Sequence, residues 1–479
     1  MTTRPIFPLL LSLAALAPLS VRAQTDASLW LTRPDRSALL QLQSPIPSTT
    51  ATATATAQII DVDPSTTFQT MDGFGFALTG GSAQLLMHMD AAKRSTLLHE
   101  FFAPSDPSAS KPDSIGVSYL RLTIGSSDMN GNVFSYDDIP LTDTDTSMSH
   151  FSLAPDEADV IPILKQILAL NPTIKILASP WSAPLWMKTN RAAQGGVLKP
   201  EFFQAYALYL TKYVQAMHAH GITIDTLTVQ NEPLNEKNTP SMLMLSPEQD
   251  EFIKTDLGPA FKQAGIKTRI VLYDHNLDHP LYALAILRDP AAAKYIDGSG
   301  FHLYGGTVDA MTQVHDAFPK KNIYFTEQSI TQRDNTGPLH ITRPVAEVII
   351  GVSRNWSKNI LLWNLAADPN NGPHTNNGGC GGCSGAITID GDNVSRNVAF
   401  YTLAHASKFV PAGSVRIASN TLDALPNVAF KTPAGKLVLI VANTSTTAQK
   451  FDIRSGVKFR SPKTFTTSLD PGAVGTYVW

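Results

Sequence analysis

The hydrophobic pattern between residues 71 and 410 repeats one unit many times: a short apolar run, then an amphipathic stretch of helical length. The apolar runs have the length of a strand. There are eight of them: Phe74–Thr79, Ser118–Gly125, Lys175–Ser182, Asp225–Glu232, Arg269–Asn276, Gly298–Gly305, Asn322–Ser329 and Asn359–Ala366. Eight strand–helix units in series predict an α/β fold, a (β/α)8 TIM barrel, which takes ~250 residues plus loop insertions.

The clearest helix precedes Glu232. It begins at Pro200, ends near Gly221 and places one apolar face at helical spacing, made of Phe203, Tyr206, Leu210, Tyr213, Val214 and Met217. Further helices are expected from Pro155 to Leu170, from Ser246, over Val308–Phe318 and over Ile341–Trp356. A doubly wound open sheet is the alternative fold, but Gly80-Gly81 lacks the spacing of its phosphate-binding turn.

The two ends of the chain have other patterns. Residues 411–479 contain short β-type runs broken by the turns Pro433-Ala434-Gly435 and Asp470-Pro471-Gly472, which predicts a C-terminal β-sandwich beside the barrel. Strands within residues 24–70 are expected to complete this sandwich, and the Thr/Ala tract at 49–57 is typical of a linker.

Residues 1–23 have the features of a secretory signal peptide. Arg4 supplies a positive end, Ile6–Leu19 is a short apolar region, and Val21-Arg22-Ala23 is a small-residue cleavage site. The apolar region is too short for a membrane span. We therefore expect a secreted protein, extracellular or periplasmic, with a retained amphipathic anchor as the alternative.

Composition and charge limit the partners. The 479 residues are 43% hydrophobic and 16% charged, which allows a large core, and the formal net charge is -3. Because no run of like charges occurs, the sequence indicates neither nucleic acid nor an anionic membrane as a partner. A neutral substrate is expected, and no membrane span.

The two cysteines, Cys380 and Cys383, lie in a glycine-rich stretch. In an exported chain this spacing favours a local disulfide, ahead of free thiols. Zinc ranks third, because it would need two further ligands.

Candidate chemistry gathers where the predicted barrel strands end, which is where active sites of this fold lie. These ends offer Arg121 and Asp128, Trp181 and Trp186, Asn231 and Glu232, Asp274 and His275, His302 and Tyr304, Glu327, and Trp363 and Asn364. Taken alone, a strand-end glutamate is as often a structural ion-paired group, and a lone tryptophan or histidine is more often part of the core. Their combination on one face of a barrel favours function.

Two carboxylates, Glu232 and Glu327, stand at matching depth on the fourth and seventh strands. Hydrolysis of a glycosidic bond needs an acid for the leaving oxygen, an ionised partner for the anomeric carbon, and aromatic faces for sugar rings. It needs no metal and no cofactor, and we expect neither. The sequence therefore predicts a glycosidase whose catalytic residues are Glu232 and Glu327.

Several motifs support this interpretation when taken together. They are Asp72-Gly73-Phe74-Gly75, YLRLTIGSSD (119–128), ILASPWSAPLWMKTN (176–190), TVQNEP (228–233), DLGPAFKQAG (256–265), FTEQS (325–329) and WNLAADPNNGP (363–373). In this order they resemble glycoside hydrolase family 30, the glucosylceramidase-like and β-1,6-glucanase-like enzymes, from about Trp30 to the C-terminus. The resemblance implies a barrel with a side β-sandwich and hydrolysis with retention at the anomeric carbon.

The resemblance also implies roles for single residues. Glu232 is similar to the acid/base and Glu327 to the nucleophile, while Asn231 matches the residue that holds the sugar 2-hydroxyl. Residues matching the sugar subsite are Arg121, Asp128, Trp181, Tyr304 and Trp363, and His302 matches a supporting residue near the nucleophile. Retention predicts carboxyl groups ~5–5.5 Å apart. We further expect Arg121 and Tyr304 to keep Glu327 ionised, and the charge of Glu327 to raise the pKa of Glu232.

One stretch differs from the mammalian glucosylceramidases. Residues 374–385, which contain both cysteines, are more similar to the bacterial polysaccharide-acting branch, including β-1,6-glucanases. We therefore expect a secreted retaining β-glycoside hydrolase acting on β-1,6-glucan or glucosylceramide-like β-glucosides. The alternatives are a β-xylosidase, xylanase or galactanase, or, in another class, a non-catalytic carbohydrate-binding protein; the intact glutamate pair speaks against the last of these.

Overall fold

The computed structural model describes residues 26–49, 58–105, 114–332, 337–456 and 463–479. The predicted signal peptide, 1–23, and nearly all of the Thr/Ala tract, 49–57, lie outside the described residues. Within the described part of the chain, no helix has the length and apolar character needed to cross a membrane.

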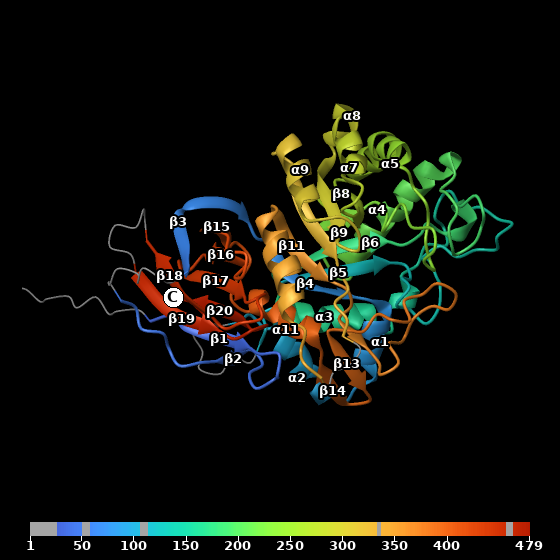
Figure 1. The fold of residues 1–479 in the computed structure, drawn as a ribbon. Coiled ribbons are helices and arrows are strands. Elements are labelled where there is room, and N and C mark those ends of the chain that lie inside the picture. Colours follow the sequence, from blue (N-terminus) through green and yellow to red (C-terminus); the bar gives the residue numbers. More distant parts are fainter. Residues whose placement is uncertain (1–25, 50–57, 106–113, 333–336, 457–462) are drawn as a thin grey trace, which may run out of the picture.

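Eight parallel strands close into a barrel, as predicted (Figure 1). In chain order they are β4 (Gly73–Leu78), β5 (Tyr119–Ile124), β6 (Lys175–Pro180), β7 (Thr226–Thr228), β8 (Arg269–Asn276), β9 (Ile296–His302), β10 (Asn322–Glu327) and β11 (Ser357–Leu362). Seven are close to the predicted runs. β7 is shorter, because the chain turns away after Thr228 and the amide of Asn231 donates to the Pro180 carbonyl at 2.8 Å.

Helices cover the outside of the barrel. They are α1 (Gly80–His88), α2 (Ala91–Phe102), α3 (Val160–Leu170), α4 (Phe203–Ala219), α5 (Ser246–Phe252), α6 (Gly258–Gln263), α7 (Pro280–Leu287), α8 (Pro290–Ala293), α9 (Asp309–Ala317), α10 (Thr342–Pro344) and α11 (Val398–Ser407), with π-helical turns at Ile253–Leu257 and Val345–Val352. The predicted face of α4 is buried as expected.

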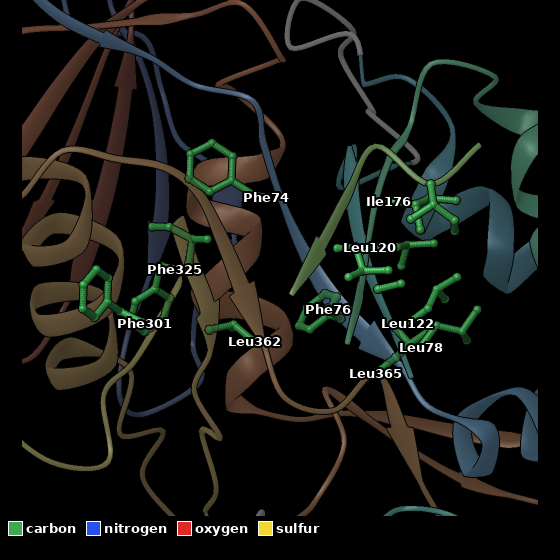
Figure 2. Packing of buried hydrophobic residues seen from close by; sticks show 14 of the residues in the cluster. Phe74, Phe76, Leu78, Leu120, Leu122, Ile176, Phe301, Phe325, Leu362 and Leu365 are labelled. Atoms are coloured by element: carbon green, nitrogen blue, oxygen red, sulfur yellow. The ribbon is translucent and has the colours of Figure 1, made fainter. Parts of the chain in front are cut away.

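Alternation along each strand separates the two faces of the barrel wall. On β5, Leu120 and Leu122 join the large apolar cluster between strands and helices (Figure 2). The alternate residues Tyr119 and Arg121 are buried on the other face, where Tyr119 packs with Leu177 and Leu361. Gly75 is required beside them, since a Cβ there would lie 1.6 Å from the Tyr119 carbonyl oxygen. Inside the barrel, the polar layer that contains Arg121 therefore lies next to an apolar layer made of Tyr119, Leu177 and Leu361.

A second sheet of nine strands lies beside the barrel, with order β19-β18-β3-β15-β16-β17-β20-β1-β2 (Figure 1). It combines N-terminal strands with C-terminal ones: β1 (Ser28–Thr32), β2 (Gln41–Leu42), β3 (Gln58–Thr70), β15 (Val415–Ser419), β16 (Asn427–Lys431), β17 (Leu437–Ala442), β18 (Gln449–Ser455), β19 (Lys463–Leu469) and β20 (Val474–Val478). The sequence pattern missed β19, whose central residues Thr464–Ser468 are mostly polar. A small sheet of β12 (Ala366–Ala367), β13 (Ile387–Asp390) and β14 (Asn393–Arg396) follows the last barrel strand.

Candidate active site

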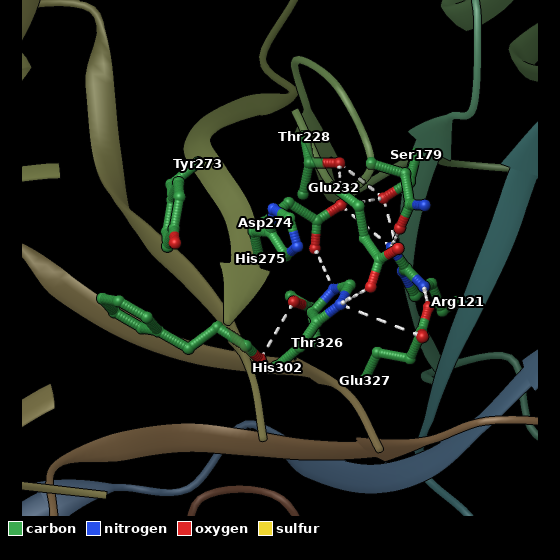
Figure 3. A network of polar contacts seen from close by, with 12 residues as sticks. Arg121, Ser179, Thr228, Glu232, Tyr273, Asp274, His275, His302, Thr326 and Glu327 are labelled. Atoms are coloured by element: carbon green, nitrogen blue, oxygen red, sulfur yellow. Dashed lines mark hydrogen bonds and ion pairs between the residues drawn. The ribbon is translucent and has the colours of Figure 1, made fainter. Parts of the chain in front are cut away.

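The polar residues at the strand ends converge on one buried network (Figure 3). Arg121 of β5 lies at its base and is fully buried. Its guanidinium donates to Glu327 Oε2, to Asn231 Oδ1 at 2.7 Å and to Asp274 Oδ2 at 2.9 Å. One arginine therefore links strands β5, β8 and β10 with the turn after β7.

Asp274 is held in this network by an irregularity in β8. Tyr273 and Asp274 both have positive φ, 71° and 72°, where the pairing of β8 with β9 shifts register. The Asp274 carboxylate also accepts hydrogen bonds from Ser179 at 2.9 Å and Thr228 at 2.6 Å. Buried on all sides, it has a pKa that burial raises but that the Arg121 charge and the His302 and Thr228 contacts bring well below its usual range. Asp274 is therefore a permanent anion of the site.

Glu232 stands in the turn after β7 and has a φ of 45°, in the left-handed region. Its amide donates to the Asp274 carbonyl at 2.9 Å, which fixes this backbone conformation. Its side chain accepts a hydrogen bond from Asn235 at 2.6 Å and is only 8% exposed as a residue. Strain of this kind persists where surrounding contacts hold it, as it does at many active sites.

Glu327 ends β10, opposite Glu232. Arg121 donates to one of its oxygens and the Tyr304 hydroxyl donates to the other at 3.0 Å. Burial, together with the charges of Glu232 and Asp274, raises the pKa of Glu327 above its ordinary value, and the charges of His302 and Arg121 offset this rise only in part. Because both oxygens accept hydrogen bonds, the geometry is that of the ionised carboxylate.

His302 lies between the acidic groups. Its Nε2 is 3.0 Å from Asp274 Oδ1, while its Nδ1 is 3.3 Å from Glu232 Oε1 and 3.9 Å from Glu327 Oε1. Burial lowers its pKa, but Glu327, Asp274 and Glu232 together raise it to about 9. The free site thus holds a proton on His302 at neutral pH.

This proton corrects one sequence-based expectation. Burial raises the pKa of Glu232, but the His302 contact and charge, with His275 and Asn235, bring it down to about 2. The expected rise caused by Glu327 is wrong for the free site, because an imidazolium stands between the two carboxylates. Glu232 and His302 act as a coupled pair that shares one proton.

Aromatic rings form one wall of the site. Trp181 and Trp363 stack with ring centroids 5.3 Å apart, and the Arg121 guanidinium lies 4.8 Å from the Trp181 ring centre. Cys383, joined to Cys380 by a disulfide, packs against this pair together with Met129 and Ala77. The stretch 374–385 also reaches Asp128, whose carbonyl accepts from the Thr375 amide at 2.9 Å.

Asp128 Oδ1 and Trp181 Nε1 are buried polar atoms at this wall that have no hydrogen-bond partner within the described chain. An acceptor and a donor left unpaired inside a protein are costly unless a ligand satisfies them. Burial raises the pKa of Asp128 to about 8, and the charges of Glu327 and Glu232 add to it. Such atoms fit sugar hydroxyls, which donate and accept.

One atom each from Glu232, His302 and Glu327 lie within 4.8 Å of one another, a spacing a metal ion could use. The Arg121 guanidinium bound to Glu327 and the proton on His302 oppose a cation there. The residues therefore fit an acid–base site better than a metal centre.

The residues predicted to act in catalysis or sugar binding all lie in this arrangement, but several of their partners were not predicted. The sequence pattern predicts Asp274 only as a strand-end group, and Ser179, Thr228 and Asn235 were not among the predicted site residues. The alternation that places the Arg121 side chain inside the barrel also places those of Ser179 and Thr228 there. The two-residue period of the strands could therefore have predicted Ser179 and Thr228 as site residues. Trp186 is not part of the network; its Nε1 donates to Asp137 at 3.0 Å.

Two domain models of one protein family match this chain. The glycosyl hydrolase family 30 TIM-barrel domain matches residues 71–410, and the family 30 beta sandwich domain matches residues 413–477. The chain belongs to glycosyl hydrolase family 30.

Relatives of the chain bear the names of glycosidases. The chain is 32% identical over 407 residues to an endo-1,6-beta-D-glucanase of Trichoderma harzianum, covering 80% of each chain. It is 29% identical over 454 residues to the lysosomal acid glucosylceramidase of Mus musculus, covering 88% of this chain and 83% of that one. Among solved structures, the endo-beta1,6-glucanase BT3312 has a TM-score of 0.84 and 33% identity, covering 95% of this chain and 99% of that one.

The buried arginine of this family 30 protein gives a first prediction. Arg121→Leu is expected to lower the free energy of unfolding by about 3–5 kcal/mol, because Glu327 and Asp274 would remain buried without their partner. Thermal or urea unfolding measures the loss. Arg343→Leu is the matched control: it breaks the exposed pair with Glu347 and should cost at most about 0.5 kcal/mol. Equal losses in the two variants would contradict a structural role for the network.

Proposed function

We propose that this protein hydrolyses β-glucosidic bonds by double displacement, with retention at the anomeric carbon. The supporting observation is the approach of Glu232 and Glu327, one oxygen of each lying within 4.8 Å of the other. Retaining glycosidases have carboxyl groups ~5–5.5 Å apart, whereas inverting enzymes leave room for a water molecule at ~6.5–9.5 Å.

In the first step, Glu327 attacks the anomeric carbon and the glycosidic C–O bond breaks. Arg121 and Tyr304 aim the carboxylate, since each holds one of its oxygens. Glu232 gives a proton to the leaving oxygen. In the second step, Glu232 removes a proton from water, the water oxygen bonds to the anomeric carbon, and Glu327 leaves.

The Glu232–His302 pair supplies the proton. In the free site it lies on His302, 3.3 Å from Glu232 Oε1. As negative charge develops on the leaving oxygen, the proton passes from His302 to Glu232 and from Glu232 to that oxygen, which leaves His302 neutral; in the second step, the proton that Glu232 takes from water returns to His302. Asp274 at 3.0 Å holds the imidazole in orientation throughout.

We assign sugar recognition to the wall that Trp181 and Trp363 form. We propose that the unpaired atoms Asp128 Oδ1 and Trp181 Nε1 bind sugar hydroxyls, and that Trp181 and Trp363 contact the apolar face of the ring. Asn231 accepts from Arg121 through Oδ1, which leaves its amide N–H₂ directed to the 2-hydroxyl beside the nucleophile. These contacts need no metal or cofactor.

β-1,6-Glucan is the polysaccharide we propose as substrate. The relatives named endo-1,6-beta-D-glucanase, from three fungi, share 31–35% identity with the chain, and the relative named as a glucosylceramidase in mouse shares 29%. Xylan is favoured less, because the xylanase structure from Talaromyces cellulolyticus, at 22% identity, shows the fold alone. We also propose export, from the signal-like residues 1–23.

A product profile tests the substrate. The purified chain is incubated with β-1,6-glucan, β-1,3-glucan, xylan, galactan and glucosylceramide, and products are separated by chromatography. We expect soluble gluco-oligosaccharides from β-1,6-glucan at a rate at least tenfold above any other polymer. Faster release from xylan or galactan would overturn the substrate, and binding without release from every substrate would favour the carbohydrate-binding alternative.

A further inference from the structure

A second cluster of acidic and imidazole side chains lies in the long segment between β5 and α3. Asp137, Asp145 and His150 each offer one ligand atom, and these three atoms lie within 4.8 Å of one another. The residues share nothing with the active site described above. Asp137 is completely buried, Asp145 is 6% exposed, and the His150 side chain reaches solvent.

The two carboxylates of this cluster have no lysine or arginine partner among the described residues, although two serine hydroxyls and the His150 amide donate to Asp145. Among the described residues, neither Asp137 nor Asp145 forms an ion pair with a lysine or arginine; Asp145 pairs with His150 at 2.9 Å. The neighbouring cation, Lys212, donates instead to the Met148 carbonyl. Two carboxylates this close repel each other unless a positive charge lies between them.

One oxygen of Asp137 has no partner. Its Oδ2 accepts from Trp186 Nε1 at 3.0 Å, but its Oδ1 is buried without a hydrogen bond to any described residue. A buried carboxylate oxygen keeps its charge only with a donor or a cation beside it. This atom is the observation that separates the cluster from an ordinary group of surface acids.

The geometry suits a first-row divalent cation. His150 Nδ1 and Asp145 Oδ2 are 2.9 Å apart and share a hydrogen bond, which a cation bound to both atoms would replace. Ser147 and Ser149 donate to the Asp145 oxygens at 2.8 and 2.9 Å, and Trp186 donates to Asp137, so the carboxylates are already oriented. An imidazole with two carboxylates favours Zn²⁺ or Mn²⁺ over Ca²⁺ or Mg²⁺, which prefer oxygen alone.

We propose that Asp137, Asp145 and His150 bind one divalent first-row cation, of the zinc or manganese class, that ties together the two ends of the stretch from residue 137 to residue 150. The segment also contains Asp128 and, with Trp186 and Ser182, lines a cavity of about 260 Å³. Asp137 accepts a hydrogen bond from Trp186, which lines this cavity, so the cation supports one wall of the cavity and its role is structural.

The test uses the full chain after treatment with a chelator. Zn²⁺, Mn²⁺, Ca²⁺ and Mg²⁺ are titrated separately by calorimetry and in thermal unfolding. We expect one equivalent of Zn²⁺ or Mn²⁺ per chain and a rise in Tm of about 2–4 °C at saturation. His150→Gln and Asp137→Asn should abolish both effects. Asp143→Asn is the matched control, since it removes the same charge from the same segment and should leave both unchanged.

The site must also be told apart from the catalytic carboxylates. Glu327→Ala should bind the cation as the unmodified chain does, and binding lost in that variant alone would overturn the proposal. Co²⁺ gives a second measurement: its visible absorption should change on binding and fail to change in His150→Gln, whose exposed side chain is tolerated on folding. Binding unaltered by His150→Gln, or no binding of Zn²⁺ or Mn²⁺ at all, would also overturn it.

Discussion

Replacing Glu327 by alanine is expected to reduce turnover of an aryl β-glucoside by on the order of 10⁴- to 10⁶-fold, because no covalent intermediate can form. Substrate affinity should change far less, since Asp128, Trp181 and Trp363 remain. The measurement is the steady-state rate with an activated substrate such as a dinitrophenyl glucoside. Glu347→Ala, which removes an exposed glutamate from the π-helical turn, is the matched control and should keep full activity.

Azide makes the role of Glu327 specific. The small anion fits the space left by the side chain and can attack the anomeric carbon directly, so partial recovery of activity is expected. The product should then be the glycosyl azide of inverted configuration, identified by NMR. Undiminished turnover in Glu327→Ala would contradict the assignment, and rescue with retained configuration would contradict attack from the face that Glu327 occupies.

Glu232→Gln should affect substrates according to their leaving group. With a poor leaving group, such as a sugar hydroxyl, the loss should be about 10³-fold or more, because the proton cannot be delivered. With a dinitrophenolate, which needs no proton, bond cleavage should continue while the second step slows, since glutamine cannot act as base. A burst of phenol followed by slow turnover is the expected kinetic pattern.

The matched comparison is Asn235→Ala, which removes the donor 2.6 Å from the Glu232 carboxylate but leaves the acid in place. It should lower the rate with every substrate by a similar, smaller factor, about tenfold. If Glu232→Gln loses equal factors with good and poor leaving groups, Glu232 is not the acid. If Asn235→Ala discriminates between leaving groups as strongly as Glu232→Gln, proton delivery depends on Asn235 as much as on Glu232, and this result would contradict Glu232 acting as the acid by itself.

The sequence determined the architecture and the pair of carboxylates. Strand periodicity alone placed Arg121, Glu232 and Glu327 at one end of a barrel, because side chains alternate and parallel strands end together. Strands of the second sheet at both ends of the chain were also predictable from the sequence pattern, whereas the C-terminal strand β19 is too polar to be recognised.

Only the tertiary structure decided where the proton lies. No local pattern shows that His302, 70 positions from Glu232 along the chain, stands 3.3 Å from it and 3.0 Å from Asp274. Protonation depends on burial and on the sum of charges within a few ångströms, and these are set by how β7, β8 and β9 meet. The positive φ of Glu232 and Asp274, which turns them toward His302, is likewise held by contacts between strands. The cluster of Asp137, Asp145 and His150 also depends on the tertiary structure. These residues are near in sequence, but only the fold shows that Asp137 is buried, with Oδ2 bonded to Trp186 and Oδ1 without a partner among the described residues.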